Sequence, residues 1–343
     1  MAERVDSPHR ELPPLPDLTP DDIIIAVMGI TGCGKSTFVN LLSDRRLKIG
    51  HGLDSCTQLV EVAPCTLENG MKIYLVDTPG FDDDTRTDAE ILQEVALWLN
   101  KAHTENLKLA GIIFLQRISD VRIGHSGIQN ITMFRKLCGE DPLASVVLAT
   151  TMWDITDEDI GITREKELEQ KPQLWKRMID HGSCVFRHDE GKASALKIID
   201  YLVQMKRPVT LDIQREMVDQ NLDLIDTSAG SEVASAVKAV IERYERKLEE
   251  VEKGLKEAFD QKLQVEREIL EAVRKEQQEI LAKQREDMQS LHVSHMQLIE
   301  EQKRRFEESQ ISAKEDIATE LEKQKKQLKE RYLRDMHDRC MVM

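Results

Sequence analysis

The stretch Gly29–Ser36 reads Gly-Ile-Thr-Gly-Cys-Gly-Lys-Ser and matches the pattern G-x-x-x-x-G-K-S at every fixed position. The apolar run Ile23–Met28 precedes it, and a stretch of helical character, Thr37–Leu42, follows it. Glycines let a backbone loop wrap around a phosphate, so that successive N–H groups and the start of the next helix point at the phosphate oxygens. A strand, this loop and a helix in this order predict a phosphate-binding loop.

Short continuous apolar runs recur between residues 21 and 205, separated by helical stretches such as Ala89–Ala102 and Gln129–Cys138. Strands buried on both faces have this composition, and their alternation with helices predicts a mainly parallel sheet. We therefore predict a three-layer α/β/α domain of the P-loop NTPase type. The runs are Ile23–Met28, Met71–Val76, Ala110–Leu115, Ala144–Ala149 and the weaker Cys184–Phe186.

The last third of the chain lacks proline, since all ten prolines lie at or before Pro208. From Val237 to Leu255 apolar residues alternate spacings of four and three, which is a heptad seam, and the register then shifts. A helix this polar buries its apolar stripe against a partner or by folding back. An intermolecular coiled coil, an intramolecular hairpin and a single charged helix remain open, and the heptad-poor stretch Gln289–Gln302 is our candidate for a bend.

These patterns divide the 343 residues into five segments. We predict a disordered, proline-containing N-terminus, an α/β domain of the P-loop NTPase type, a helical linker, a coiled coil and a short tail. Their boundaries are 1–20, 21–205, 206–230, 231–338 and 339–343.

The net charge of −15 gives the chain no electrostatic footprint for nucleic acid, because neutralising phosphates requires clustered Lys and Arg. The first 20 residues lack the apolar stretch of a signal peptide, and no run approaches the roughly 18 apolar residues that span a bilayer. None of the six cysteines forms a C-x-x-C pair. We expect a cytoplasmic protein.

A second motif, Asp77-Thr78-Pro79-Gly80, follows the predicted strand at residues 71–76. An Asp at this place can hold the shell of a Mg²⁺ ion, and Gly80 can offer its N–H to a γ-phosphate. In the first motif, Lys35 is a point charge for the β- and γ-phosphates and the Ser36 hydroxyl is a Mg²⁺ ligand. Thr57, with Ser55 as the alternative, is a candidate to contact Mg²⁺ when a γ-phosphate is present.

The choice of base depends on Thr151-Met152-Trp153-Asp154, which follows the predicted strand at residues 144–149. GTPases commonly carry [N/T]-K-x-D here, and the Asp accepts two hydrogen bonds that guanine offers and adenine does not. Met152 stands where Lys usually covers the base, although a thioether can pack on a ring face. The segment Gly182–His188 is in place for a further base-lining loop.

The predicted site thus holds GTP or GDP with Mg²⁺. Predicted nucleotide contacts are Gly29, Ile30, Thr31, Gly32, Cys33, Gly34, Lys35, Ser36, Thr37, Asp77, Gly80, Thr151 and Asp154. Predicted Mg²⁺ ligands are Ser36, Thr57 and Asp77, and predicted catalytic residues are Lys35, Thr57 and Arg117.

These motifs resemble septin-like GTPases over roughly residues 22–230, and the segment Arg117-Ile118-Ser119-Asp120 is similar to fungal G domain-containing proteins. The pattern is most similar to immunity-associated (avirulence-induced) GTPases and to fungal G domain-containing proteins with a C-terminal coiled coil. The resemblance implies a homodimer or oligomer formed through the GTPase domain, the coiled coil or both. Phe81 stands where a glutamine would orient water, so we expect slow hydrolysis by the monomer. Arg117 or Arg122, donated across a dimer, is our candidate for raising the rate.

The chain ends in Cys340-Met341-Val342-Met343, which fits the C-a-a-X box for prenylation. Seven cations against three acids precede it between Lys323 and Arg339. A prenyl chain plus a basic segment is the combination that stable membrane binding needs. We therefore expect Cys340 either to anchor the chain to a cytosolic membrane face or to be an ordinary terminal cysteine.

Three functional hypotheses follow from the sequence. The first is a GTP-dependent switch with slow, dimerisation-stimulated hydrolysis. The second is a coiled-coil interaction protein that uses its nucleotide structurally and does not turn it over. The third is an ATPase.

Overall fold

The computed structural model describes residues 18–44, 47, 59–83, 85–205, 207–260, 264–292, 297, 298 and 300. The chain divides into two compact units, Pro16–Leu298 and a unit made of the two chain ends. The sheet and the helices belong to the first of them. Thr57 and Cys340 lie outside the described residues, as does the part of the predicted coiled coil beyond residue 300.

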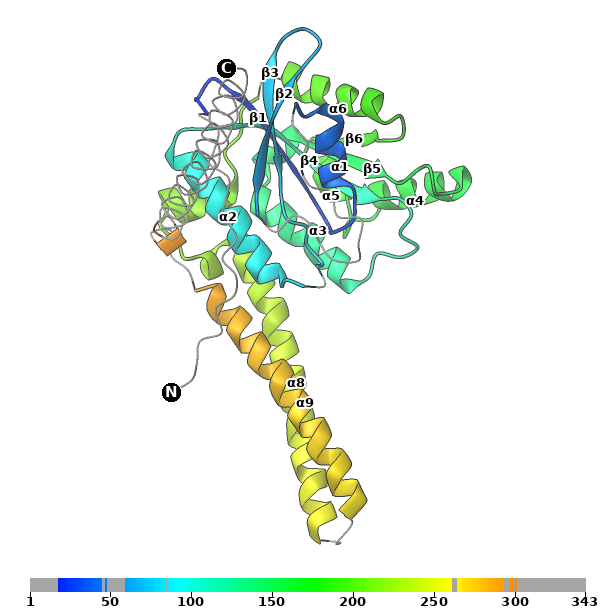
Figure 1. Ribbon diagram of the computed structural model, residues 1–343, viewed down its shortest axis with the longest axis vertical. Helices are drawn as coiled ribbons and strands as arrows, with labels where there is room; N and C mark the ends of the chain where they lie inside the picture. Colours follow the sequence, from blue (N-terminus) through cyan, green and yellow to red (C-terminus); the bar gives the residue numbers. More distant parts are fainter. Residues whose placement is uncertain are drawn as a thin grey trace, which may run out of the picture. The chain divides into compact units, whose positions relative to one another are not determined.

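One six-stranded sheet with the order β2-β3-β1-β4-β5-β6 forms the centre of the domain (Figure 1). Every neighbouring pair is parallel except β2 and β3. This confirms the predicted α/β class with a mainly parallel sheet. The strands are β1 (Ile23–Gly29), β2 (Glu61–Thr66), β3 (Lys72–Asp77), β4 (Leu109–Arg117), β5 (Val146–Thr151) and β6 (Cys184–Arg187).

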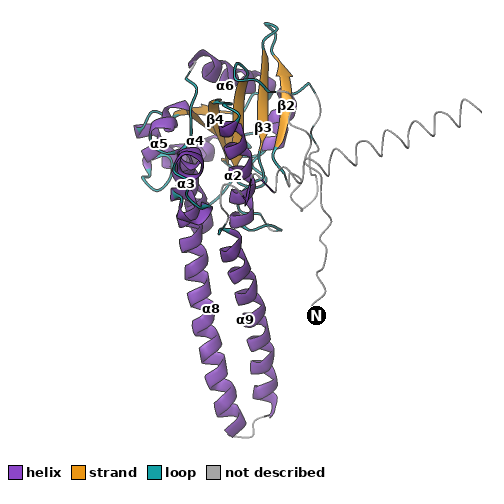
Figure 2. Ribbon diagram, turned by 90° about the vertical axis from the view of Figure 1, so that its left-hand side faces the viewer, coloured by secondary structure: helices purple, strands orange, loops and turns teal. Residues whose placement is uncertain are grey.

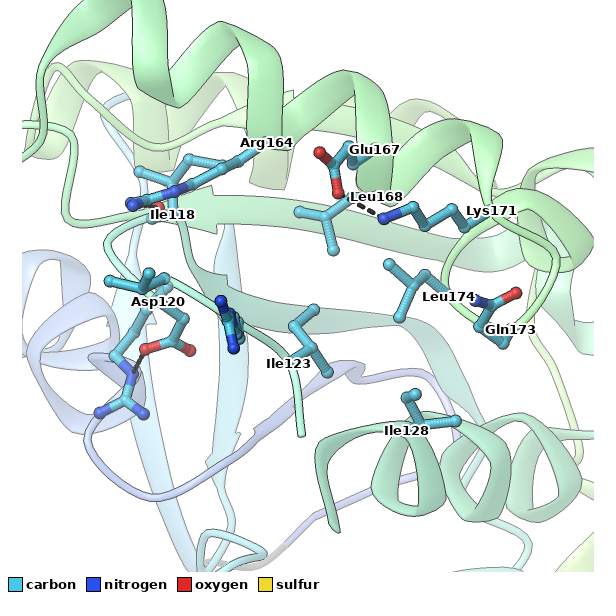
Figure 3. Close-up of a pocket in the computed structure, with 13 residues that line it drawn as sticks. Ile118, Asp120, Ile123, Ile128, Arg164, Glu167, Leu168, Lys171, Gln173 and Leu174 are labelled. Atoms are coloured by element: carbon cyan, nitrogen blue, oxygen red, sulfur yellow. Dashed lines mark hydrogen bonds and ion pairs between the residues drawn. The ribbon is translucent and has the colours of Figure 1, made fainter. Parts of the chain in front are cut away.

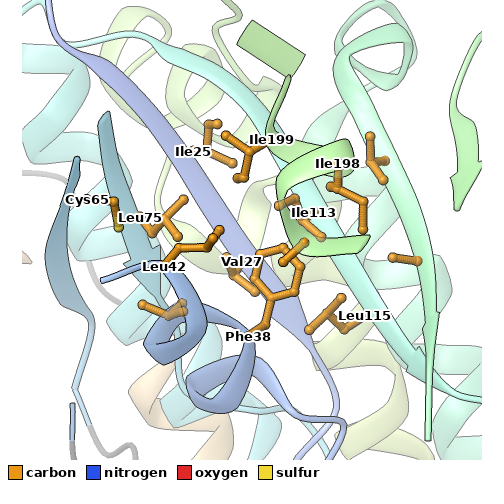
Figure 4. Packing of buried hydrophobic residues seen from close by; sticks show 14 of the residues in the cluster. Ile25, Val27, Phe38, Leu42, Cys65, Leu75, Ile113, Leu115, Ile198 and Ile199 are labelled. Atoms are coloured by element: carbon orange, nitrogen blue, oxygen red, sulfur yellow. The ribbon is translucent and has the colours of Figure 1, made fainter. Parts of the chain in front are cut away.

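Helices cover both faces of the sheet (Figure 1). Side chains alternate along β1, and Ile25 and Val27 join the cluster that includes Phe38 of α1 and Ile198 of α6 (Figure 4). The helices that follow the strands are α1 (Lys35–Leu42), α2 (Asp88–Thr104), α3 (His125–Cys138), α4 (Glu158–Gln170), α5 (Lys176–Asp180) and α6 (Lys192–Met205). A 3₁₀ turn, Asp141–Ser145, leads into β5.

The predicted helical linker, 206–230, is a series of short helical pieces among its described residues. These are α7 (Asp212–Gln214), a π-helical turn (Arg215–Asp219), a 3₁₀ turn (Leu224–Asp226) and the start of a long helix at Ser228. The Gln214 side chain donates to the backbone oxygen of Leu99 in α2 over 2.8 Å. Apolar residues of this segment are buried, which ties it to the domain and prevents it from being a free helix.

Two long helices, α8 (Ser228–Asp260) and α9 (Gln264–Ser290), form an antiparallel hairpin (Figure 2). Arg274 pairs with Glu252 over 3.3 Å, and Arg285 pairs with Glu245 over 2.8 Å. Of the three arrangements left open by the heptad seam, the described residues adopt the intramolecular hairpin. No helix among them is long and apolar enough to cross a membrane.

The hairpin reverses between α8 and α9, not within Gln289–Gln302 as we predicted. The seam explains the difference, because its register already shifts after Leu255, just before the reversal. The end of α9 at Ser290 does fall in the heptad-poor stretch. There the Ile225 N–H donates to the Leu291 carbonyl over 3.0 Å, so α9 returns to the base of α8.

Gly230 fixes the start of this hairpin. Its N–H donates to the buried Thr227 hydroxyl over 2.9 Å, and a Cβ at this position would lie 1.7 Å from the Leu224 carbonyl oxygen. We expect Gly230→Ala to lower the free energy of unfolding by about 2 kcal/mol or more, because backbone must move. The check is denaturant unfolding followed by circular dichroism.

The matched control is Gly254→Ala in the same helix. A Cβ there meets only the end of the Leu270 side chain at 3.3 Å, and replacing a helix-interior glycine removes a cost of up to about 1 kcal/mol. We expect this variant to unfold at the same or a higher denaturant concentration than the unmodified chain. Equal unfolding midpoints for the two variants would contradict the claim that the backbone at position 230 requires glycine.

Candidate functional site

The predicted phosphate loop connects β1 directly to α1. Its conformation depends on glycine, because Gly29, Gly32 and Gly34 have φ values of 144°, 75° and 96°. A Cβ on Gly29 would also lie 2.4 Å from the Leu115 carbonyl oxygen of β4. Only glycine adopts these dihedral angles at little cost, so the sequence pattern and the loop geometry agree.

Lys35, the first residue of α1, folds back over the loop. Its ammonium group donates to the carbonyl oxygens of Gly29, over 3.2 Å, and of Ile30, over 2.9 Å. Only 6% of the residue is exposed. A buried cation surrounded by a curled backbone is an arrangement suited to an anionic ligand.

The other residues of the loop differ in burial. Cys33 is fully buried, and this burial raises the pKa of its thiol although the nearby Lys35 and Arg117 charges oppose the change. The thiol therefore stays protonated and is poorly suited to react. Ile30 is also buried, whereas Thr37 is exposed on the first turn of α1.

Asp77 lies at the end of β3, beside the end of β1, where it pairs in register with Val27. The Ser36 hydroxyl lies 2.6 Å from its Oδ2 atom. Hydroxyl and carboxylate oxygens are the hard donors that Mg²⁺ prefers, and Mg²⁺ usually takes few protein ligands together with phosphate oxygens. The two residues therefore fit a phosphate-bound Mg²⁺, and no cluster of three or more His, Cys, Asp or Glu offers a separate metal site within the described residues.

Gly80 brings a second loop against the first. The Thr31 hydroxyl donates to the Gly80 carbonyl over 3.0 Å and lies 3.2 Å from the Asp83 carboxylate. A Cβ on Gly80 would lie 2.6 Å from the Lys35 ammonium nitrogen. Sequence reasoning missed Asp83, because no motif marks a carboxylate at that spacing.

Phe81 follows Gly80 and is 1% exposed. Its backbone oxygen accepts a hydrogen bond from the Thr31 N–H over 2.7 Å. The side chain is part of the core and offers no polar atom toward the loop.

The predicted base loop follows β5. The Thr151 hydroxyl donates to the Cys33 carbonyl over 2.9 Å, so Thr151 connects the base loop to the backbone of the phosphate loop. Met152 has φ +63°, and its Cε atom lies 3.9 Å from where a Cβ of Gly34 would be. Asp154 is exposed at the tip of the loop.

The segment 182–188 reaches the same region through its last two residues. The Arg187 guanidinium lies over the Trp153 ring, 4.3 Å from its centroid. The His188 ring packs edge-on against Phe38 of α1 at 5.0 Å, and burial lowers the pKa of this imidazole. No sequence motif marks the Arg187–Trp153 pair, because the two residues are brought together only by the order of strands in the sheet.

Arg117 ends β4 and lies beside the phosphate loop of its own chain. Its Nη1 atom is 3.2 Å from where a Cβ of Gly32 would be. Asp120 pairs with its Nε atom over 3.0 Å and also accepts a hydrogen bond from Gln116 over 2.9 Å. Within one chain the Arg117 guanidinium is therefore paired with Asp120, and its donation across a dimer stays a prediction.

A cavity of about 260 Å³ opens next to Arg117 (Figure 3). Ile123, Ile128 and Leu174 line it together with Arg122. Arg117 lines this cavity and also lies beside the phosphate loop, but no residue of the loop lines the cavity.

Comparison with known proteins agrees with this geometry. Residues 24–137, about a third of the chain, match the model of the 50S ribosome-binding GTPase family. No curated protein sequence matches the chain significantly.

Solved structures with a similar fold include Toc33 from Arabidopsis thaliana in complex with Mg²⁺ and GMPPNP. It is 14% identical, covers 55% of this chain and 88% of its own, and has a TM-score of 0.44. Era from Aquifex aeolicus bound to GDP·AlF4⁻ is 18% identical over 53% of this chain and 55% of its own, with a TM-score of 0.36.

Gly80 tests the close contact between the two loops. Gly80→Ala places a methyl group against Lys35 and Thr31, so we expect affinity for GTP to fall by about tenfold or more. The measurement is an equilibrium titration with a fluorescent GTP analogue. Gly124→Ala is the control, since a Cβ there meets nothing within 4 Å, and equal affinities for the two variants would contradict the contact.

Proposed function

We propose, from the P-loop GTPase domain that this chain carries, that the protein binds GTP and GDP with Mg²⁺ as a nucleotide-dependent switch. The observation that carries the proposal is the glycine-shaped loop 29–36 closed by the buried Lys35. Slow hydrolysis that a second subunit stimulates, and the finer resemblance to septin-like and immunity-associated GTPases, belong to the same proposal.

The phosphates would be held by the backbone N–H groups of residues 29–36 and by the Lys35 ammonium group. The Thr37 hydroxyl or N–H would reach the α-phosphate. Ser36 and Asp77 would hold Mg²⁺, which offsets charge on the β- and γ-phosphates when it is bound. Gly80 supports this assignment, because its backbone approaches Lys35 more closely than any side chain would allow.

Guanine would be selected by Asp154, whose carboxylate can accept hydrogen bonds from the base N1–H and exocyclic amine. Met152 supports the assignment by its position against Gly34, where its thioether can pack on a base. The ammonium group that other GTPases provide at this position is absent, so we propose specificity for guanine with a reduced contribution to affinity.

Slow hydrolysis is supported by Phe81, whose buried side chain cannot orient a water molecule. Arg117 is close to the loop but is held by Asp120. A single subunit would therefore offer the developing charge little beyond Lys35 and Mg²⁺. We propose that assembly of a dimer frees or replaces this arginine contact and raises the rate.

A homodimer at the nucleotide edge of the sheet is supported by exposed apolar side chains. Val121 follows β4 and is 78% exposed, and Ile155 follows β5 and is 70% exposed. The carboxyl ends of these strands lie at the edge of the sheet that also holds the phosphate loop. Exposed apolar groups gathered beside a ligand site are suited to contact with a second subunit.

The hairpin is our proposed output of the switch. Thr87 caps α2 just after the loop that contains Gly80 and Asp83, and its side chain opposes the rise in the pKa of the Asp287 carboxyl of α9 that burial causes. Any movement of the loop would therefore reach α9 through the first turn of α2. Membrane attachment through a prenylated Cys340 and a cytoplasmic location remain proposals from the sequence alone.

Lys35→Ala tests the nucleotide site. The variant loses the only ammonium group that the structure places against Gly29 and Ile30, within the described residues. We expect its affinity for GTP and GDP to fall by about a hundredfold, roughly 2.7 kcal/mol, in calorimetric titration. Lys197→Ala removes an exposed lysine paired with Glu190 and is the control. Unchanged affinity in Lys35→Ala would remove the proposed function.

Turnover as a function of protein concentration tests the switch. We expect the single-turnover rate of GTP hydrolysis per subunit to rise with concentration, and Arg117→Ala to abolish that rise while nucleotide binding persists. Bound nucleotide without turnover at any concentration would instead support a scaffold. The buried Phe81 is compatible with that result, because its side chain cannot orient a water molecule for hydrolysis. Equal competition by ATP would identify an ATPase.

A further inference from the structure

The loop that presents Asp154 is held by side chains from two strands. Trp153 lies between Met152 and Asp154 in this loop, and its ring is covered by the Arg187 guanidinium at 4.3 Å. Arg187 ends β6, so the stack joins the loop after β5 to the loop after β6. This is a cation–π contact, for which tryptophan is the most favourable aromatic partner.

Glu165 of α4 fixes the guanidinium in place. Its two carboxylate oxygens accept hydrogen bonds from the Arg187 Nε atom over 3.0 and 2.9 Å. Glu165 is 8% exposed, and a carboxylate this buried requires the paired cation. Its hydrogen bonds also raise the pKa of Arg187, so the guanidinium keeps its charge.

Thr150 and Gly161 contact the parts of the Trp153 ring that Arg187 does not cover. The Trp153 Nε1–H donates to the Thr150 hydroxyl over 2.9 Å, and that hydroxyl lies 3.4 Å from Glu165 Oε1. Gly161 of α4 leaves room for the ring, because a Cβ there would lie 2.6 Å from it. The ring therefore has one position between α4 and Arg187.

The backbone of this loop needs such support. Met152 has φ +63°, which costs a residue with a side chain of this size about 1 kcal/mol or more. Thr156 supports it through a 2.8 Å hydrogen bond from its hydroxyl to the Met152 carbonyl. Asp154 itself is exposed, so its direction depends on residues 152 and 153.

We infer that Trp153, Arg187 and Glu165 form a clamp that positions Asp154 and thereby sets the selectivity of the site for the guanine exocyclic amine. The inference rests on the proposed guanine-nucleotide function and deepens it. These three are positioning residues, because their contacts join them to one another and to the loop that carries Asp154.

The test compares the affinities for GDP and for IDP, which differs only in lacking that amine. We expect the unmodified chain to prefer GDP, Asp154→Ala to lose the preference, and Arg187→Met and Trp153→Leu to lower it by about fivefold or more. Trp153→Phe keeps a ring beneath the guanidinium and should retain most of the preference. Affinities are measured by calorimetric titration, and thermal unfolding is followed in parallel.

Arg215→Met is the matched control, because Arg215 is also ion-paired and partly exposed but pairs with Asp212 of α7. It should keep the full preference for GDP. A purely structural role of the clamp would lower affinity for GDP and IDP by the same factor, so the affinity ratio separates positioning from stability. If Arg187→Met does not fold, the comparison of Trp153→Leu with Trp153→Phe decides.

Two failures are distinguishable. If the unmodified chain and Asp154→Ala both bind GDP and IDP equally, guanine recognition by this loop is wrong and the clamp has nothing to position. If the unmodified chain prefers GDP and Asp154→Ala does not, but Trp153→Leu keeps the full preference, the proposed function stands and the clamp is overturned.

Discussion

The ammonium group of Lys35 is the charge around which the nucleotide half of the domain is arranged. At 6% exposed it has left most of its water, which is costly unless acceptors surround it. The carbonyls of Gly29 and Ile30 are such acceptors because the loop curls back through glycines at positive φ. Gly80 then brings the second loop to the same nitrogen. The close approach of two backbones to one buried cation therefore dictates the residue types at the ends of β1 and β3.

Much of the sheet could be predicted because its inner strands are covered on both faces. Burial on both sides requires continuous apolar runs such as Ile23–Met28, and the sequence shows them. β2 was missed because it is an antiparallel edge strand of mixed polarity, and its Pro64 is tolerated only where a backbone donor is not needed. The hairpin was one of three possibilities for a related reason. A heptad seam records that a stripe is buried, but it is the same whether another chain or the same chain covers it.

The residues of the site also fall into two groups, those that a local motif predicts and those that only the tertiary structure brings together. Residues that bind through backbone shape fall within one motif, so the sequence locates Gly29, Gly34 and Lys35 directly. Contacts across the sheet carry no local pattern, and Arg187 reaches Trp153 from 34 positions away along the chain. The same holds for Arg117, whose place beside Gly32 depends on β4 lying next to β1. Tertiary neighbours of this kind follow from strand order, which a motif does not encode.

The hairpin is attached to both helices that follow the loops of the site. Glu232 of α8 pairs with Lys136 of α3 over 2.7 Å, and Asp287 of α9 interacts with Thr87 at the start of α2. A ligand shifts a conformational equilibrium only by its difference in affinity for the two states. For this chain that difference must arise at the loops around Gly80 and Arg117, because these precede α2 and α3. Burial raises the pKa of Asp287, although the Thr87 side chain and the Lys283 charge oppose the change. The junction combines these polar contacts with buried apolar side chains such as Val233 and Leu291. A movement of either loop would therefore be passed to the hairpin as a shift of packed elements.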